Sequence, residues 1–243
     1  MFDFHCHILP AIDDGSQSME QSIRLARQCV ESGVTHVVAT PHAVGENLQK
    51  QIIARDAKIV ELRNALKDNG ITLEVIPGIE YMADGHAAAS ALEVPACRCG
   101  KPDYEQRPLL QELPFAISVT FAQKCLFNAQ LKGVTLVLAH PERYTKFTAN
   151  VPMFKELLDR GIYLQFNSDN FHSGLFSHSR FKAILELIKY MPEQILVGSD
   201  AHNPDHRPAG LEDAMKHITK SFGKSVWELI SQETPAQLLG YAN

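Results

Sequence analysis

Seven short apolar stretches along the chain have the composition of buried β-strands, and helical patterns lie between them. The strand-like stretches occupy residues 2–4, 34–40, 71–76, 109–111, 134–139, 162–166 and 195–199. Helical periodicity is clear over residues 18–33, 52–69 and 181–188, and weaker over residues 119–132, 151–160 and 211–222. Strands that alternate with helices predict a mostly parallel sheet with crossover helices, which is an α/β fold.

A histidine or an acidic residue follows nearly every one of these strand-like stretches. In chain order they are His5 with His7, His42, Glu80, Glu112, His140, and Asp200 with His202. An open sheet gathers its ligands at one switch point, whereas a (β/α) barrel gathers side chains from many strand ends on one rim. The pattern therefore predicts a seven-stranded (β/α) barrel with these side chains on a single rim.

Length and charge limit the kinds of protein that this chain can be. A chain of 243 residues suits one domain, which we expect to span residues 1–243. The net charge is −5 and lysines and arginines form no run, so nucleic acid and anionic membrane are poor partners. No apolar stretch approaches the ~20 residues of a membrane span, and a cleaved signal peptide is not expected. Because the cysteines follow no secreted spacing pattern, we expect a cytoplasmic protein.

The spacing of the first and last ligand pairs points to a metal. Strand alternation turns residues 5 and 7 to the same side, and Asp200 and His202 repeat the spacing of His5 and His7. A carboxylate after an apolar strand is costly unless it is paired or bound to metal. A single histidine or glutamate in such a place is more often an ordinary residue, so the prediction depends on the whole set.

The five cysteines predict no catalytic thiol. A nucleophilic cysteine in a phosphate-binding loop has an arginine six positions after it, and that position here holds Ile12, Thr35, Asp103, Glu105 or Leu131. Cys6 lies between two expected ligands and should point the opposite way, into the core. Residues 95–104 are the least regular part of the chain and predict an exposed loop, with Cys97 and Cys99 binding no metal.

Taken in order, the motifs resemble those of the PHP (polymerase and histidinol phosphatase) superfamily. They are His5-Cys6-His7-Ile8-Leu9-Pro10 with Asp13-Asp14-Gly15, Thr40-Pro41-His42, Gly78-Ile79-Glu80-Tyr81, Leu110-Gln111-Glu112-Leu113, His140-Pro141-Glu142-Arg143-Tyr144 and Gly198-Ser199-Asp200-Ala201-His202. The aspartate pair and the His-Pro-Glu-Arg-Tyr string are more similar to the bacterial PHP-type tyrosine-protein phosphatases of capsule and exopolysaccharide gene clusters than to histidinol phosphatases. The resemblance covers residue 1 to about Pro208.

This resemblance implies a distorted seven-stranded barrel that holds three divalent metal ions. His5, His7, Glu80 and Asp200 are the implied ligands of the first ion, Glu80, Glu112 and His140 of the second, and Asp14, His42 and His202 of the third. Mixed nitrogen and oxygen ligation suits Mn²⁺, Fe or Zn²⁺. Arg143 and Arg207 are expected to hold the phosphate and to stabilise its transition state, because a guanidinium binds phosphate oxygens bidentately.

The expected activity is hydrolysis of protein phosphotyrosine by a metal-activated hydroxide. The resemblance suggests the tyrosine-rich tail of a bacterial autokinase that regulates capsule or exopolysaccharide synthesis as the substrate. Two alternatives remain open: a small-molecule phosphatase similar to histidinol phosphatase, and a non-catalytic metal-binding regulatory module. Neither the proton donor nor the oligomeric state follows from the sequence.

Overall fold

The computed structural model describes residues 1–83, 91–116, 119–144, 146–171 and 178–242. The strands are β1 (Phe2–Cys6), β2 (His36–Ala39), β3 (His42–Ala43), β4 (Glu74–Pro77), β5 (Glu80–Met82), β6 (Leu109–Glu112), β7 (Leu136–Ala139), β8 (Tyr163–Asn167) and β9 (Ile195–Gly198). The helices are α1 (Met19–Glu31), α2 (Leu48–Asp68), α3 (Val119–Leu131), α4 (Val151–Asp159), α5 (His178–Tyr190), α6 (Glu212–Phe222), α7 (Lys224–Glu228) and α8 (Thr234–Leu239). Within these ranges, no helix is long and apolar enough to cross a membrane.

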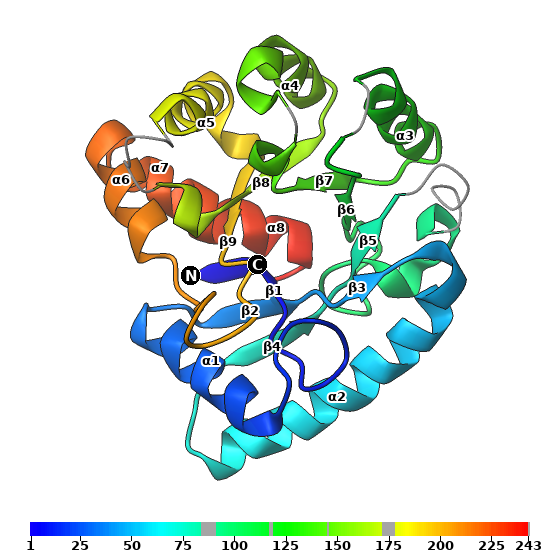
Figure 1. Cartoon of the computed structure of the whole chain (residues 1–243), viewed down its shortest axis with the longest axis vertical. Coiled ribbons are helices and arrows are strands. Elements are labelled where there is room, and N and C mark those ends of the chain that lie inside the picture. Colours follow the sequence, from blue (N-terminus) through cyan, green and yellow to red (C-terminus); the bar gives the residue numbers. More distant parts are fainter. Residues whose placement is uncertain (84–90, 117–118, 145, 172–177, 243) are drawn as a thin grey trace.

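The strands form two parallel sheets, ordered β1-β2-β4 and β3-β5-β6-β7-β8-β9. β3 follows β2 after two residues, and β5 follows β4 after two residues, so the predicted stretches at 34–40 and 71–76 each continue into a second strand. A parallel bridge between Cys6 and Ala201 brings the end of β1 beside the segment that follows β9. The strands surround a common centre and most helices lie outside them (Figure 1). The predicted α/β fold is confirmed.

Two apolar clusters hold this arrangement together. The larger one fills the space between strands and surrounding helices, and it includes Cys6, as expected for a residue that points away from the ligands. The smaller one lies between the strands and includes Phe4, Val38, Ile76, Leu110, Val137 and Leu196, together with Leu238 and Leu239 of α8. Each buried leucine stabilises the fold by about 1.5–3 kcal/mol relative to an exposed one. The sequence patterns did not predict α8, which contributes to this inner cluster and contacts β1 and β9.

The prediction of an exposed loop at residues 95–104 is wrong for its two cysteines. Cys97 and Cys99 are both fully buried, and Cys99 belongs to the inner apolar cluster. The missing side chain of Gly78 makes room for it, because a Cβ there would lie 2.8 Å from the Cys99 sulfur. Irregular backbone therefore did not mean exposure here.

Candidate metal centre

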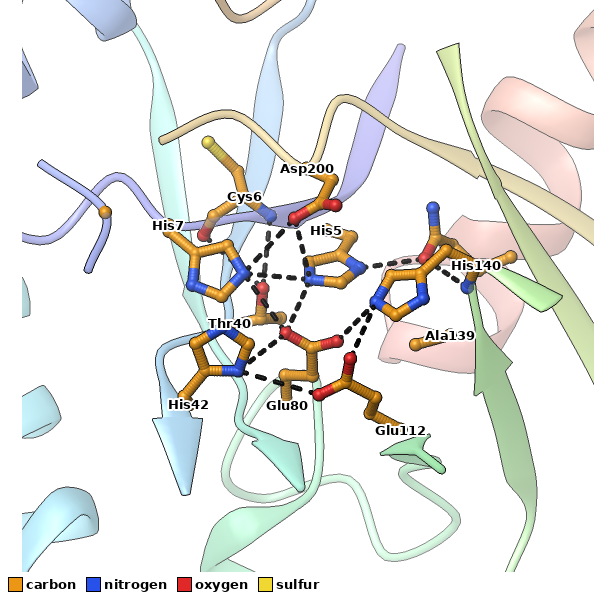
Figure 2. A network of polar contacts seen from close by, with 12 residues as sticks. His5, Cys6, His7, Thr40, His42, Glu80, Glu112, Ala139, His140 and Asp200 are labelled. Carbon is orange, nitrogen blue, oxygen red and sulfur yellow. Dashed lines mark hydrogen bonds and ion pairs between the residues drawn. The ribbon is translucent and has the colours of Figure 1, made fainter. Parts of the chain in front are cut away.

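All nine predicted metal ligands come together where the strands end, and Figure 2 shows seven of their side chains converging on one centre. Their ligand atoms form four overlapping groups, each within 4.8 Å: His7, Asp14, His42 and His202; His5, His7 and Asp200; His5, Glu80 and His140; and His42, Glu80 and Glu112. Because the groups share residues, they make one continuous cluster. Binding of metal by these side chains stays a prediction.

Close packing of β1 against the segment after β9 positions the two outer motifs. The Nε2 atoms of His5 and His7 lie 3.1 Å apart, so both rings turn to the same side as strand alternation predicted. The backbone N–H of Asp200 donates to the carbonyl of His5 at 2.7 Å. Gly198 is required between them, since a Cβ there would lie 2.6 Å from the His5 Cβ. Asp200 and His140 both have positive φ angles, 52° and 29°, which is strained backbone of the kind that collects at functional sites.

Glu80 lies at the middle of the cluster. Its Oε2 atom is 3.1 Å from both His5 Nε2 and His42 Nδ1 and 3.2 Å from His7 Nε2, while its Oε1 atom is 2.7 Å from His140 Nε2. Despite three close nitrogens, the buried Oε2 accepts no hydrogen bond of acceptable geometry. An unpaired buried carboxylate oxygen is costly, whereas a divalent cation satisfies such an atom and the surrounding imidazole lone pairs together. The donor set therefore fits a divalent metal.

The carboxylates repel one another where no cation separates them. Burial, and then the charge of Glu80, raise the pKa of Glu112 to about 7. Burial opposes ionisation of Glu80 as well, but the charge of His5 and the hydrogen bond from His140 outweigh it and hold the pKa of Glu80 well below its usual range. A cation would also favour the ionised form of Glu112, because metal charge dominates local electrostatics. Glu112 is thus the carboxylate of this pair whose ionised form the surrounding protein disfavours.

The division of ligands among three ions is less clear in the structure than the sequence resemblance implies. His42 Nε2 lies 3.4 Å from Asp14 Oδ1, in agreement with a shared third ion. Its Nδ1, however, lies 3.1 Å from Glu80 and 3.9 Å from Glu112. His42 therefore touches two of the implied ligand sets, with one ring nitrogen facing each.

Three imidazoles are oriented by partners on their Nδ1 atoms, which is typical of metal-binding histidines. His7 Nδ1 lies 2.8 Å from Asp13 Oδ2, and His5 Nδ1 lies 2.8 Å from Gln165 Oε1. His202 Nδ1 lies 2.9 Å from the carbonyl of Asp200. Sequence reasoning assigned no role to Asp13 or Gln165. The only available signals were the carboxylate beside Asp14 and a polar residue within the apolar stretch 162–166.

Arg143 and Arg207 meet at the same carboxylate oxygen. Arg143 Nη1 donates to Asp200 Oδ2 at 2.9 Å, and Arg207 Nη2 donates to it at 2.7 Å. Burial opposes ionisation of Asp200, yet the charges of His5 and His7 hold its pKa well below the usual range. Both arginine side chains stay more than a third exposed, so further guanidinium N–H groups remain available to a ligand.

A cavity of about 480 Å³ opens over the cluster. Its charged lining consists of Asp14, His42, Glu112, Arg143, His202 and Arg207, and its apolar lining of Ala43, Val44, Met82 and Phe115. Phe115 is 48% exposed, and the guanidinium of Arg143 lies 6.0 Å from its ring centre. The cavity thus combines a side lined by two arginines and four predicted metal ligands with an apolar wall.

Solved barrel enzymes share the fold at low sequence identity. The lactonase Lmo2620 from Listeria monocytogenes matches with a TM-score of 0.62 and 12% identity, covering all of this chain and 95% of that chain. A variant organophosphorus hydrolase from Deinococcus radiodurans matches with a TM-score of 0.58 and 13% identity, covering 98% of this chain and 92% of that chain. These likenesses support the α/β barrel architecture alone.

The chain belongs to the capsular polysaccharide synthesis CpsB/CapC family, whose model matches residues 1–240. It is 30% identical to tyrosine-protein phosphatase YwqE of Bacillus subtilis, covering 98% of this chain and 91% of the relative. It is 27% identical to tyrosine-protein phosphatase CpsB of Streptococcus pneumoniae, with 98% of each covered. A crystal structure from work on these two proteins, described as unique metal-dependent tyrosine phosphatases, matches with a TM-score of 0.82 and 29% identity over 100% of this chain and 96% of that chain. The family predicted from the motifs is confirmed.

Proposed function

We propose that this chain is a metal-dependent protein-tyrosine phosphatase. The observation that carries the proposal is the convergence of nine histidine and carboxylate side chains, four of which line one cavity together with two arginines and an apolar wall. The names of the relatives support the same activity. Residues 1–243 act as one domain in this proposal.

Three divalent cations, with Mn²⁺ the first choice and Fe or Zn²⁺ as alternatives, are held by the nine ligand residues. When bound, such cations make water acidic enough to attack phosphorus and neutralise the charge of the phosphate. Glu80 holds the centre of the site because its two oxygens face four imidazoles. Asp13 and Gln165 keep His7 and His5 oriented toward that centre.

Arg143 and Arg207 bind the phosphate and stabilise the charge that develops on its oxygens in the transition state. Their shared contact with Asp200 holds both guanidiniums at the edge of the cavity before substrate arrives. A short antiparallel bridge between Asn203 and Arg207 fixes the backbone that carries the second arginine. Both groups are therefore preorganised, and little reorganisation is needed when the phosphate binds.

The apolar wall binds the aromatic ring of the substrate. Val44 and Phe115 are among the exposed large apolar side chains of the described residues, and both line this cavity together with Met82. Aromatic pairs contribute about 0.5–1.5 kcal/mol beyond the burial of their area. This wall suits the phenyl ring of phosphotyrosine better than the polar side chain of a small metabolite such as histidinol phosphate.

The substrate in this proposal is the tyrosine-rich tail of a bacterial autokinase that controls capsule or exopolysaccharide synthesis. The family description and the capsule-related names of relatives support that assignment. A cytoplasmic location follows from the same assignment, and the five free, buried thiols suit a reducing compartment.

A substrate panel tests the proposal. We expect a phosphotyrosine peptide to have a higher kcat/KM than a phosphoserine peptide of the same sequence or histidinol phosphate. Phe115→Ala should lower kcat/KM for the phosphotyrosine peptide by about 2–10-fold, from the loss of the aromatic contact. Phe127→Ala is the matched control, because Phe127 is 49% exposed but lies on α3 outside the cavity lining. Preference for histidinol phosphate, with no effect of Phe115→Ala, would instead identify a small-molecule phosphatase.

A further inference from the structure

Strand β8 supplies none of the nine predicted ligands, yet it carries two buried amide side chains directly beneath them. Gln165 is fully buried and Asn167 is 2% exposed. Gln165 Oε1 lies 2.8 Å from His5 Nδ1, and Gln165 Nε2 donates to Asn167 Oδ1 at 3.0 Å. Asn167 Nδ2 donates to Asp200 Oδ2 at 2.8 Å. These contacts join two of the predicted ligands through two amides, and we name Gln165 and Asn167 the β8 relay.

The groups at the two ends of the β8 relay fix the direction in which its hydrogen bonds are donated. At one end, Asp200 Oδ2 also accepts from two arginines, so it is an ionised acceptor and Asn167 must turn its NH₂ group toward it. The oxygen of Asn167 then faces the NH₂ group of Gln165. At the other end, the oxygen of Gln165 is also approached by a backbone donor, the N–H of His140, at 3.4 Å. His5 Nδ1 must therefore carry a proton and donate it to Gln165, since both amides are fixed by their partners.

A proton on Nδ1 leaves Nε2 of neutral His5 as a bare lone pair. That atom lies 3.1 Å from His7 Nε2, 3.1 Å from Glu80 Oε2 and 3.6 Å from Asp200 Oδ1. His7 is fixed in the same tautomer because its Nδ1 donates to Asp13. Two bare nitrogens and two carboxylate oxygens within this distance repel one another unless a proton or a metal ion lies among them.

We propose that the β8 relay sets the tautomer and orientation of His5 and thereby positions its Nε2 to bind a metal ion. Gln165 and Asn167 are positioning residues in this proposal, and they act through His5 and Asp200. The proposal rests on the metal site of the proposed function and adds to it a role for β8.

The packing around the β8 relay supports a dedicated role. The backbone N–H of Asn167 donates to Glu142 Oε1 at 2.9 Å, which holds the end of β8 in place. A Cβ on Gly198 would lie 3.0 Å from Gln165 Nε2, so the neighbouring strand leaves room for the amide. Buried amides are costly unless their hydrogen bonds are made, and here the network makes them.

Metal binding by three purified variants tests this proposal. Gln165→Met keeps the length of the side chain and removes the amide. Gln165→Glu keeps an oxygen that accepts from His5. Leu164→Ala is the matched control, because Leu164 is a fully buried residue of the same strand that belongs to the larger apolar cluster and is not a predicted ligand. Mn²⁺ is titrated into each metal-free protein. The His5 tautomer is read from ¹⁵N-histidine NMR spectra recorded before Mn²⁺ is added.

We expect Gln165→Met to raise the Mn²⁺ concentration for half-saturation by about 10–100-fold, because losing the hydrogen-bond partner of a metal-binding histidine has an effect of this size. The variant should also lose the single Nδ1–H tautomer of His5. Gln165→Glu should keep that tautomer, because its carboxylate still accepts from His5 Nδ1 although it cannot donate to Asn167. Leu164→Ala should lose stability but no affinity. Wild-type affinity and tautomer in a folded Gln165→Met variant would overturn the proposal. Absence of Mn²⁺ binding by the wild-type protein would instead refute the metal site of the proposed function.

Discussion

Replacing Asp13 by asparagine should destabilise the metal-free protein by an amount that the contacts of Asp13 define. Oδ2 accepts from His7 Nδ1 at 2.8 Å and from the backbone N–H of His42 at 3.0 Å, and Oδ1 accepts from the N–H of Gly15 at 2.9 Å. Asparagine offers one oxygen and one NH₂ group, so at least one of these buried donors loses its acceptor. The negative charge beside His7 is lost as well.

The size of the effect follows from the pKa of this carboxyl. Burial tends to raise it, but the hydrogen bond and charge of His7 outweigh burial and lower the pKa of Asp13 from 3.8 to about 2. Such a shift corresponds to about 2.5 kcal/mol of stability. Because the folded-state value lies below the unfolded one, this stabilisation is fully present above about pH 5 and is lost as the pH falls toward 2. About half of it should remain at pH 3.

Urea denaturation of chelator-treated protein at pH 7 and pH 3 measures this difference. We expect Asp13→Asn to lower the free energy of unfolding by about 2–3 kcal/mol at pH 7 and by about half as much at pH 3. Asp14→Asn is the control, since the Asp14 side chain is 68% exposed and its loss should change stability by less than about 0.5 kcal/mol. Equal losses at the two pH values, or none at pH 7, would refute the assigned pairing with His7.

Three further predictions concern the chemistry. Glu80→Ala should lower metal content and rate together. Glu142→Ala should leave the metal content of the folded protein nearly unchanged, because the Glu142 carboxylate accepts hydrogen bonds from Asn167 and Asn170 and lies outside the ligand groups. Equal metal loss in both variants would reject Glu80 as the central ligand. Arg143→Ala and Arg207→Ala should each lower kcat/KM by about 100-fold, or ~2.7 kcal/mol, with metal content retained, and wild-type turnover would remove their assigned role. Replacing all five cysteines by serine should cost stability but keep the chemistry. Burial raises the pKa of Cys97 to about 12 and of Cys99 to about 11, so these thiols stay protonated and are poor nucleophiles. Loss of catalysis in a folded, metal-replete variant would argue for a thiol mechanism.

The sequence predicted the strands and the residues that follow them because both depend on local pattern. His140, for example, directly follows the apolar strand β7, and a parallel α/β fold gathers such strand ends at one edge. Eight of the nine predicted ligands come together for this reason, whereas Asp14 was predicted from the family resemblance.

The partners of those ligands could not be predicted, because their roles depend on which strands become neighbours. Gln165 is a polar residue inside an apolar stretch, and nothing local distinguishes it from a surface-facing position of a strand. Its role appears only once β8 lies beside β7 and β9, with His5 close by. The burial of Cys99 depends in the same way on a distant glycine, Gly78.

The most direct test of the central claim is turnover of a phosphotyrosine peptide by the protein before chelation, after chelation, and after return of Mn²⁺, Fe²⁺ or Zn²⁺. A chain of this length has a large core of its own, so chelation should abolish activity while the circular dichroism spectrum stays largely unchanged. At least one of the three ions should then restore the rate. Full activity in chelated protein from which all metal has been removed would contradict a metal-dependent phosphatase, and complete unfolding on chelation would show that the metals are structural.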